Sequence, residues 1–480
     1  MDRTDANGAL IQAGSASQKT SLSQAALEAA LDRSGTSPKS GFQDLPVELL
    51  QAISRQVASG SAGDAAAGLH AIMLSNKYLK ASVLAETSVK EHYLFLQPLI
   101  GAFKALKPQL AIHRINSHML ALMGPKQRQE QVTAVLGLAD DWQKSEAIAG
   151  LAAGLAHLSE SQREELVTAA LGLAYDSDKT QAIAGLGAGL EHLIESQQQA
   201  LVTAALGLAE DWQKSRAIAG LGTGLAHLSE SRQEALVTAA LSLAIGGDKA
   251  QAIAGLGAGL AALERSQQEA LVTAVLGLAG DRQKSEAIAG LAAGLAHLSE
   301  SQREDLVTAA LGLADEWNRG KVLAGLGAGL AHLSESQQQK LVTAALDLAD
   351  DLYRGTAVAG LSAGLAHLSE SQQQKLVTAA LGLNDGWEKS MAIAKLGAGL
   401  AHLSESQQQK LVTAALSLAI EGDKSRAIAG VGAGLAHLSE SQQQKLVTAA
   451  LGLTGGLQKA QAIAGLANGY QASRVRDYLR

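Results

Sequence analysis

Leu166-Val167-Thr168-Ala169-Ala170-Leu171 is the stretch of sequence that decides the fold, because the chain repeats it along three quarters of its length. The same six residues begin again at positions 201, 236, 306, 341, 376, 411 and 446, and close variants begin at 131 and 271. Ten units therefore follow one another at a constant interval of 35 residues. A fixed period of this length is the signature of a repeat array, in which each unit packs on its neighbours.

Each unit has the pattern of two helices. Ser159-Glu160-Ser161-Gln162 is typical of a capping box, in which the Ser hydroxyl and the Gln side chain satisfy the first free amides of a helix. We expect this helix to run to about residue 174, before a polar break at 175–178. A second helix is predicted from apolar residues at helical intervals, namely Ile183, Leu186, Leu190 and Leu193. Two helices of about 14 residues and two short turns account for the unit.

The repeat predicts an all-α fold, an α-solenoid of about eleven helical hairpins of 35 residues each. Ahead of the ten clear units, residues 119–127 align with residues 154–162, so a degenerate hairpin is expected to cap the array. The first 41 residues combine Ser, Thr, Gly, Gln and Asp with scattered Ala and Leu, and they bury too little apolar surface to offset their chain entropy. We predict a disordered leader at 1–41, a small helical module at 42–95, the capping repeat at 96–130 and the solenoid at 131–480.

The composition excludes several classes of function. A net charge of -7 offers no basic footprint for nucleic acid, so protein is the expected partner and nucleic acid an unlikely one. The chain has no Cys and therefore no disulfide, thiolate metal site or cysteine nucleophile. Its apolar runs fall short of the roughly 20 residues that span a bilayer, so we expect no contact with a membrane. No catalytic or nucleotide-binding motif occurs, and we predict neither enzymatic activity, cofactor nor metal.

Glycines inside the second helix point to close packing. Gly185 and Gly189 lie four residues apart, and nearly every unit keeps such a pair. Each glycine inside a helix costs on the order of 1 kcal/mol relative to Ala. We expect this cost to be offset by a close approach of neighbouring helices. A phosphate-binding role is less favoured, because a phosphate-binding loop needs its glycines before a helix and not inside it.

Two columns of residues keep their chemistry in the aligned units. One is basic in all ten units: Lys144, Lys179, Lys214, Lys249, Lys284, Arg319, Arg354, Lys389, Lys424 and Lys459. It is either a cationic stripe for an acidic partner or a set of ion pairs, with the carboxylate three residues earlier or with the next unit, and we favour the ion pairs. The other column holds eight histidines. Units roughly 10 Å apart cannot bring these together on one metal, so we expect each imidazole to bond free carbonyls at the end of the second helix.

Two further columns keep their place but vary in chemistry. They lie two residues before and two residues after the basic column, and they hold all four Trp of the protein. Variable residues on a fixed scaffold are where a solenoid recognises a partner, and Trp is enriched at binding hot spots. The alternative is that these residues vary because selection on an exposed turn is weak. We predict a partner-binding edge formed by Trp142, Trp212, Arg216, Arg282, Trp317, Lys321, Trp387 and Arg426.

The segment before the repeats resembles an F-box, the three-helix module that docks on the Skp1 subunit of a cullin-type ubiquitin ligase. Leu45-Pro46 and Glu48 match its Leu-Pro-x-Glu opening, Ile53 matches its next apolar anchor, and the segment 74–78 matches its close, with Tyr78 where Trp is typical. The stretch 58–67 is longer and richer in Gly than usual. The resemblance implies a Skp1-binding surface made by Leu45, Pro46, Glu48, Leu49, Leu50, Ile53, Leu74 and Tyr78.

A Ser-rich leader, an F-box-like module and a nearly perfect repeat array without Cys together resemble type III-secreted effectors of plant-associated bacteria. The hairpins look similar to HEAT or tetratricopeptide repeats, although they lack the diagnostic residues of either. This resemblance implies a leader that carries a secretion signal and delivery into a host cell, where the chain recruits the Skp1-cullin ligase to a target held by the repeats. The alternatives are a helical-repeat scaffold without a ubiquitin link and a nucleic-acid reader that uses one repeat per base.

Overall fold

The computed structural model describes residues 120, 123–384 and 386–479, and all of them belong to one compact unit of the chain. Throughout these residues the regular elements are helices, so the predicted all-α solenoid is confirmed. The predicted leader at 1–41, the F-box-like module at 42–95 and most of the capping repeat at 96–130 lie outside the described residues.

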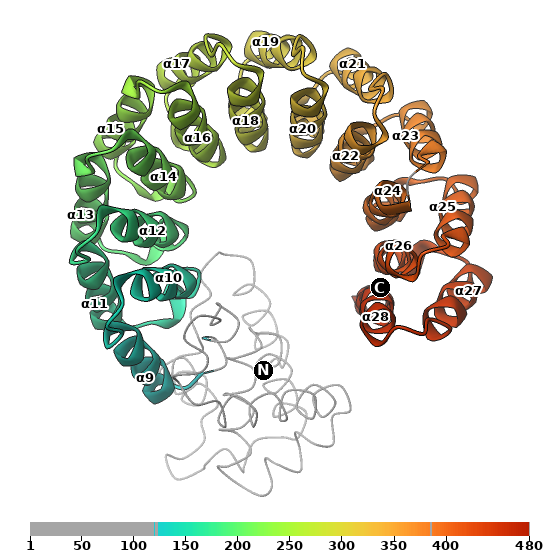
Figure 1. The fold of residues 1–480 in the computed structure, drawn as a ribbon, viewed down its shortest axis with the longest axis horizontal. Helices are drawn as coiled ribbons and strands as arrows, with labels where there is room; N and C mark the ends of the chain where they lie inside the picture. Colours follow the sequence, from blue (N-terminus) through green and yellow to red (C-terminus); the bar gives the residue numbers. More distant parts are fainter. Residues whose placement is uncertain (1–119, 121–122, 385, 480) are drawn as a thin grey trace, which may run out of the picture. The chain divides into compact units, whose positions relative to one another are not determined.

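The helices form two layers of a curved stack (Figure 1). The first helix of each hairpin lies in the outer layer: α9 (Pro125–Leu136), α11 (Glu160–Leu171), α13 (Glu195–Gly207), α15 (Glu230–Ser242), α17 (Arg265–Leu276), α19 (Glu300–Leu311), α21 (Glu335–Leu346), α23 (Glu370–Gly382), α25 (Glu405–Ser417) and α27 (Glu440–Leu451). The second lies in the inner layer: α10 (Asp141–Ala152), α12 (Asp176–Leu186), α14 (Asp211–Gly222), α16 (Gly246–Leu256), α18 (Asp281–Leu291), α20 (Glu316–Leu326), α22 (Asp351–Leu361), α24 (Gly386–Ala398), α26 (Glu421–Ala433) and α28 (Gly456–Leu479). Below, these are called outer and inner helices.

The hairpin differs from the predicted one at the ends of its helices. The outer helix α11 ends at Leu171, and the residues expected to form a polar break are the cap and first turn of α12. The inner helix ends earlier than predicted, because the Gly-rich segment after it tightens into a 3₁₀ helix, which reflects the poor α-helix propensity of glycine. The 3₁₀ segments are η3 (Leu155–His157), η4 (Gly187–His192), η5 (Leu225–His227), η6 (Gly257–Ala262), η7 (Ala292–His297), η8 (Gly327–His332), η9 (Ser362–His367), η10 (Leu400–His402) and η11 (Leu435–His437).

The predicted capping box at the start of the outer helices is confirmed. In α11 the Ser159 hydroxyl accepts the Gln162 amide at 3.3 Å, and the Gln162 side chain accepts the Ser159 amide at 2.8 Å. The same reciprocal pair forms at the starts of α19, α21, α23 and α27. Two of the four free amides at the start of the helix are thereby satisfied inside the unit.

One continuous apolar core runs between the two layers. In each unit the outer helix contributes residues such as Leu201 and Val202, and the inner helix contributes residues such as Ile218 and Leu221, all with at most 2% of their surface exposed. The aliphatic core explains how a chain with 3% aromatic residues folds, because thin side chains fill the narrow space between closely spaced helices.

The inner helices touch backbone to backbone at their glycines. A Cβ on Gly220 of α14 would lie 2.3 Å from the Cα of Ala184 in α12, and one on Gly185 would lie 2.5 Å from the Cα of Ala149 in α10. Gly189 likewise faces Leu155, so the close packing predicted for these glycines is confirmed. Neighbouring outer helices are joined by long polar side chains, as where Gln162 donates to Gln129 at 2.8 Å, and they lie further apart than the inner helices. Closer spacing in one layer bends the stack toward that layer, which is the curvature seen in Figure 1.

We expect the inner-layer glycines to be needed for stability, and α26 offers a matched pair to test this. A Cβ on Gly430 would meet the Cα of Ala394 at 2.3 Å, whereas one on Gly422 would meet nothing within 4 Å. Gly430→Ala should lower the free energy of unfolding by about 1–3 kcal/mol through overpacking. Gly422→Ala should raise it slightly, because Ala favours a helix. Urea unfolding followed by circular dichroism measures both, and equal effects would contradict the proposed role of the contact.

Candidate functional site

The inner helices all point the same way, so their starts form one edge of the stack. We call this row the N-terminal edge; in each unit it consists of the residue that precedes the inner helix and the second residue of that helix. The first residue of the helix, between these two, is usually acidic, and it ties each unit to the next. Asp141 Oδ2 accepts the Ala174 amide at 2.9 Å, and Asp211 Oδ2 accepts the Ala244 amide at 3.1 Å.

These acid-to-amide bonds continue toward the C-terminal end of the array. Asp351 accepts the Asn384 amide at 2.8 Å, and Glu421 accepts the Thr454 amide at 3.0 Å. The bond from Asn384, followed by the Arg354 guanidinium, lowers the pKa of Asp351. Backbone and hydroxyl bonds from Thr454 lower the pKa of Glu421. The edge is therefore fixed in place from unit to unit by charged side chains.

The basic column lies partly buried behind this edge. All ten of its side chains are half-buried. Lys179 pairs with Asp176 at 3.5 Å, Arg319 with Glu316 at 3.4 Å, and Arg354 with Asp351. The favoured prediction of ion pairs with the carboxylate three residues earlier is confirmed in these three units. In these three units the ion pair braces the helix start and occupies the cation. The prediction is wrong in four others, where the carboxylate accepts a backbone amide of the next unit instead: Asp141, Asp211, Asp281 and Glu421.

The structure places the predicted partner-binding residues on the exposed face of the first two turns of the inner helices. Trp142 is 60% exposed, Trp212 is 45% exposed, and Trp317 and Trp387 are each 44% exposed. Arg282 is also exposed, at the second position of α18. The four indoles belong to α10, α14, α20 and α24. They are thus spaced along the stack and do not converge on one pocket.

Several cationic side chains from the predicted set lie against these rings or bridge neighbouring units. Lys321 lies over the ring of Trp317, with its Nζ 5.7 Å from the centroid. Arg426 lies over the ring of Trp387 from the next inner helix, at 5.6 Å. Arg216 donates to the Gln181 carboxamide of the preceding unit. A cation over an aromatic face holds the ring in place and leaves part of its surface free.

Sequence reasoning missed a glutamine column inside the stack. Gln198 is buried, and its Nε2 donates to the carbonyls of Leu190 at 2.9 Å and Leu193 at 3.1 Å. The same pair of bonds is made by Gln233, Gln268, Gln338, Gln373, Gln408 and Gln443. The signal in the sequence that could have indicated this column is the repeated Gln-Gln pair after the cap.

These bonds change the interpretation of the histidine column. In these seven units the carbonyls at the end of the second helix accept from the glutamines, where imidazoles were predicted to donate. His297, His332, His367 and His402 are instead exposed. The His192 imidazole lies 3.2 Å from the adjacent Glu191 carboxylate, which also lies 4.0 Å from His227. Within the described part of the chain, no group of three or more acidic or histidine side chains is placed to hold a metal ion.

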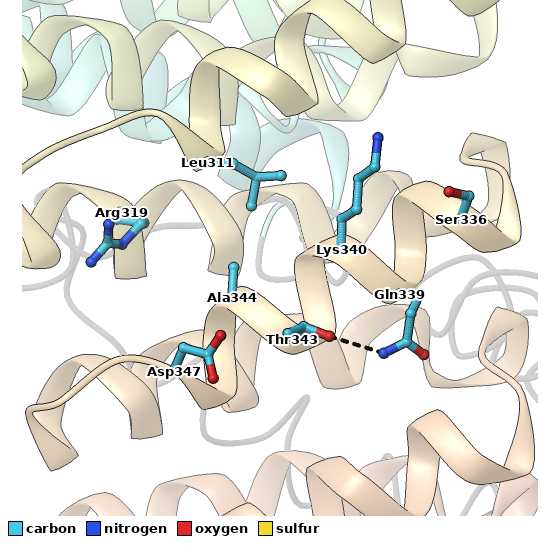
Figure 2. A pocket seen from close by; sticks show the side chains of 8 residues that line it. All are labelled: Leu311, Arg319, Ser336, Gln339, Lys340, Thr343, Ala344 and Asp347. Atoms are coloured by element: carbon cyan, nitrogen blue, oxygen red, sulfur yellow. Dashed lines mark hydrogen bonds between the residues drawn. The ribbon is translucent and has the colours of Figure 1, made fainter.

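The outer layer carries open grooves between neighbouring helices. Figure 2 shows one of about 550 Å³, lined mainly by α21 with Leu311 of α19 and Arg319 of α20 at its rim. Its Gln339 side chain donates to the Thr343 hydroxyl at 2.9 Å, so part of its polar lining is already bonded. A related groove lies between α15 and α17. Grooves that recur between outer helices follow from the repeat and do not indicate a dedicated small-molecule site.

Comparisons with known proteins found similar solved structures but no family. No protein-family model matches the sequence, and no curated protein matches it. Among solved structures, the chain is similar to Kap121p bound to Pho4p, with a TM-score of 0.39, 11% identity and coverage of 97% of this chain and 56% of that chain. It is also similar to the karyopherin Kap121p bound to the SUMO protease Ulp1p, with a TM-score of 0.39, 13% identity and coverage of 92% and 55%. The chain thus spans about half the length of these proteins, and at such scores we draw nothing further from the likeness.

No helix in the described residues combines the length and apolar character that a membrane span requires.

We expect the edge carboxylates to make stability depend on pH. Because the pKa of Asp351 is lowered by folding, its contribution is present above the unfolded-state pKa and is lost as pH falls through the folded-state pKa. Asp351→Asn should lower the free energy of unfolding by about 1 kcal/mol at neutral pH and by much less in acid. Asp347→Asn makes the same change of charge at an exposed site and is the control. Urea titrations at neutral and acidic pH measure both, and a pH-independent effect of Asp351→Asn would contradict the prediction.

Proposed function

We propose that this chain is a protein-binding scaffold that recognises its partner along the N-terminal edge and the adjoining exposed face of the inner helices. The observation that carries the proposal is the row of four indoles, each at least 44% exposed, on helices held rigidly by inter-unit bonds. Exposed Trp on a fixed frame is unusual for a surface that only faces water, and Trp and Arg dominate binding hot spots.

A protein fits this surface better than a nucleic acid does. The basic column is half-buried, and Lys179, Arg319 and Arg354 already pair with carboxylates. The chain as a whole is acidic, with a net charge of -7. Binding to phosphates draws most of its affinity from cations free to replace counterions. The one-repeat-per-base hypothesis therefore has less support than binding to a protein.

The finer proposal is that the chain is an adaptor that brings a target to a Skp1-cullin ubiquitin ligase in a host cell, after type III secretion. Its support is the F-box-like sequence, above all Leu45, Pro46 and Ile53, together with the leader and the repeats. These residues lie outside the described part of the chain. In this proposal the solenoid selects the target, while the ligase performs the transfer, so the chain itself needs no catalytic residue or cofactor.

Partner capture tests the scaffold proposal. The full chain and the variant Trp212→Ala, Trp317→Ala, Trp387→Ala are used as baits in cytosolic extract of plant cells. Proteins retained by the unchanged chain should be lost from the variant, because each hot-spot Trp contributes about 2 kcal/mol or more to binding. The control is Ile194→Ser, which removes an apolar side chain of similar exposure, 45%, at the opposite edge. A set of captured proteins that is the same for both variants would contradict the proposal.

Recovery of Skp1 tests the finer proposal. Purified Skp1 should bind the full chain and fail to bind the variant Leu45→Ala, Pro46→Ala, because the two side chains are expected to fill the apolar part of its docking surface. The Trp variant described above should bind Skp1 normally. Equal recovery of Skp1 by the unchanged chain and the Leu45 and Pro46 variant would remove the ubiquitin link and leave the scaffold.

A further inference from the structure

The N-terminal edge carries more exposed apolar surface than its tryptophans alone. The described part of the chain has twelve exposed large apolar residues, and nine of them lie on this edge. Six occupy the second position of an inner helix: Trp142, Trp212, Trp317, Leu352, Trp387 and Leu457. Three occupy the position before the helix: Tyr175, Ile245 and Ile420. The concentration of apolar side chains on one edge needs a partner to cover it.

Where one of the two edge positions holds a large apolar residue, the other position of the same unit does not. Where Ile245 or Ile420 precedes the helix, the second position holds Gly247 or Gly422. Where Trp142 is second, the residue before the helix is Asp140. Nine of the ten units thus present one large apolar side chain at the edge, and the fifth unit presents Arg282 instead. Drift at an exposed turn would not keep one such residue per unit while moving it between two positions.

The order of these residues along the edge is close to symmetric about its middle. The third unit and the eighth unit both place a Trp at the second position, and the second unit and the ninth unit both place the apolar residue before the helix. Counting inward from the two ends gives the pairs Trp142 with Leu457, Tyr175 with Ile420, Trp212 with Trp387, Ile245 with Leu352, and Arg282 with Trp317.

The two central units are complementary in charge as well. The fifth unit carries Arg282 and Glu286, and the sixth unit carries Trp317 and Lys321 at the corresponding positions. Placed opposite each other, these units would set a guanidinium on an indole and a carboxylate against an ammonium. The acidic residues Asp140 and Asp315 of the edge cap their own helices, each accepting an amide at 2.8 Å.

We infer that a second copy of this chain covers the N-terminal edge, with the two copies antiparallel so that each unit faces the unit equally far from the other end. This inference rests on the proposed function, since it names the protein that the edge binds. The twofold axis that relates the two copies runs parallel to the plane of the curved stack and passes over its middle. It reverses the order of the units and turns the second copy over, so the two N-terminal edges face each other. Such a contact is isologous, the commonest arrangement in dimers.

The exposed apolar area is a large part of what a stable dimer needs. A large aromatic side chain can bury about 150–250 Å², so the five aromatic residues of the edge, about half exposed, present on the order of 500 Å² per copy, and the four aliphatic residues add to this. A standard interface buries roughly 800 Å² per partner. The polar or charged residues between the apolar ones supply the rim.

The mass of the full chain in solution is the first test. Sedimentation equilibrium at micromolar concentration should give twice the 49.2 kDa of one chain. Trp212→Ser should weaken the dimer about 100-fold, because the pair of Trp212 with Trp387 occurs twice in a twofold interface. Ile194→Ser, at the opposite edge, should leave the dissociation constant unchanged. A monomeric chain would overturn the inference. If that monomer still captured other proteins through its tryptophans, the proposed function would stand.

Cysteine cross-linking tests the register. The natural chain has no Cys, so a double variant Ser177→Cys, Gly422→Cys introduces the only thiols, in the two units predicted to face each other. A Cβ at Gly422 meets nothing within 4 Å, so the side chain fits. This variant should form covalent dimers with a thiol-specific cross-linker, whereas Ser177→Cys, Gly247→Cys should not. Cross-linking of both double variants to the same extent, or of Ser177→Cys alone, would overturn the antiparallel register.

Charge reversal gives an independent measure of the same register. Glu286→Lys places two ammonium groups opposite each other and should weaken the dimer about tenfold, and Lys321→Glu should do the same with two carboxylates. The double variant Glu286→Lys, Lys321→Glu restores opposite charges and should recover the original dissociation constant. Additive losses in the double variant would contradict the pairing of the two central units.

Discussion

The backbone contact between neighbouring inner helices is the constraint on which the rest of this structure depends. Gly220 and Ala184 meet where a methyl group on the glycine would overlap the alanine backbone, and the same pair recurs along the array. Because the inner helices are held this close while the outer helices lie further apart, the stack curves. The curvature and the fixed spacing together align the helix starts into one edge, which is the surface that recognition requires.

Much of the fold could be predicted from the sequence, because the repeat is strict. The period fixes the hairpin, the Ser-x-x-Gln cap fixes the start of the outer helix, and Gly185 and Gly189 indicate the close contact. The end of the inner helix could not be predicted from apolar spacing, since Leu190 is buried whether it follows an α-helix or a 3₁₀ turn. Periodicity reports which side chains face the core and is insensitive to how tightly the backbone winds.

The candidate site was predictable in its position more than in its chemistry. The variable column two residues before the basic column is mostly exposed, and Trp317 and Lys321 do lie together, but the column two residues after it is mostly half-buried. The carboxylates at the helix starts were expected to pair with cations within the unit, yet Asp141 and Asp211 reach a backbone amide in the next one. Bonds between units join residues 33 positions apart. They depend on how hairpins are stacked, which no single unit encodes.

All the inter-unit junctions are alike, so the number of hairpins in this protein can change. Insertion or loss of one 35-residue hairpin would join ends that already fit, so the array can lengthen or shorten without a new core or a new cap. What such a change would disturb is the sequence of side chains along the edge, whose midpoint would move by half a hairpin. Selection for a particular number of units would therefore act through recognition, while stability would tolerate many lengths.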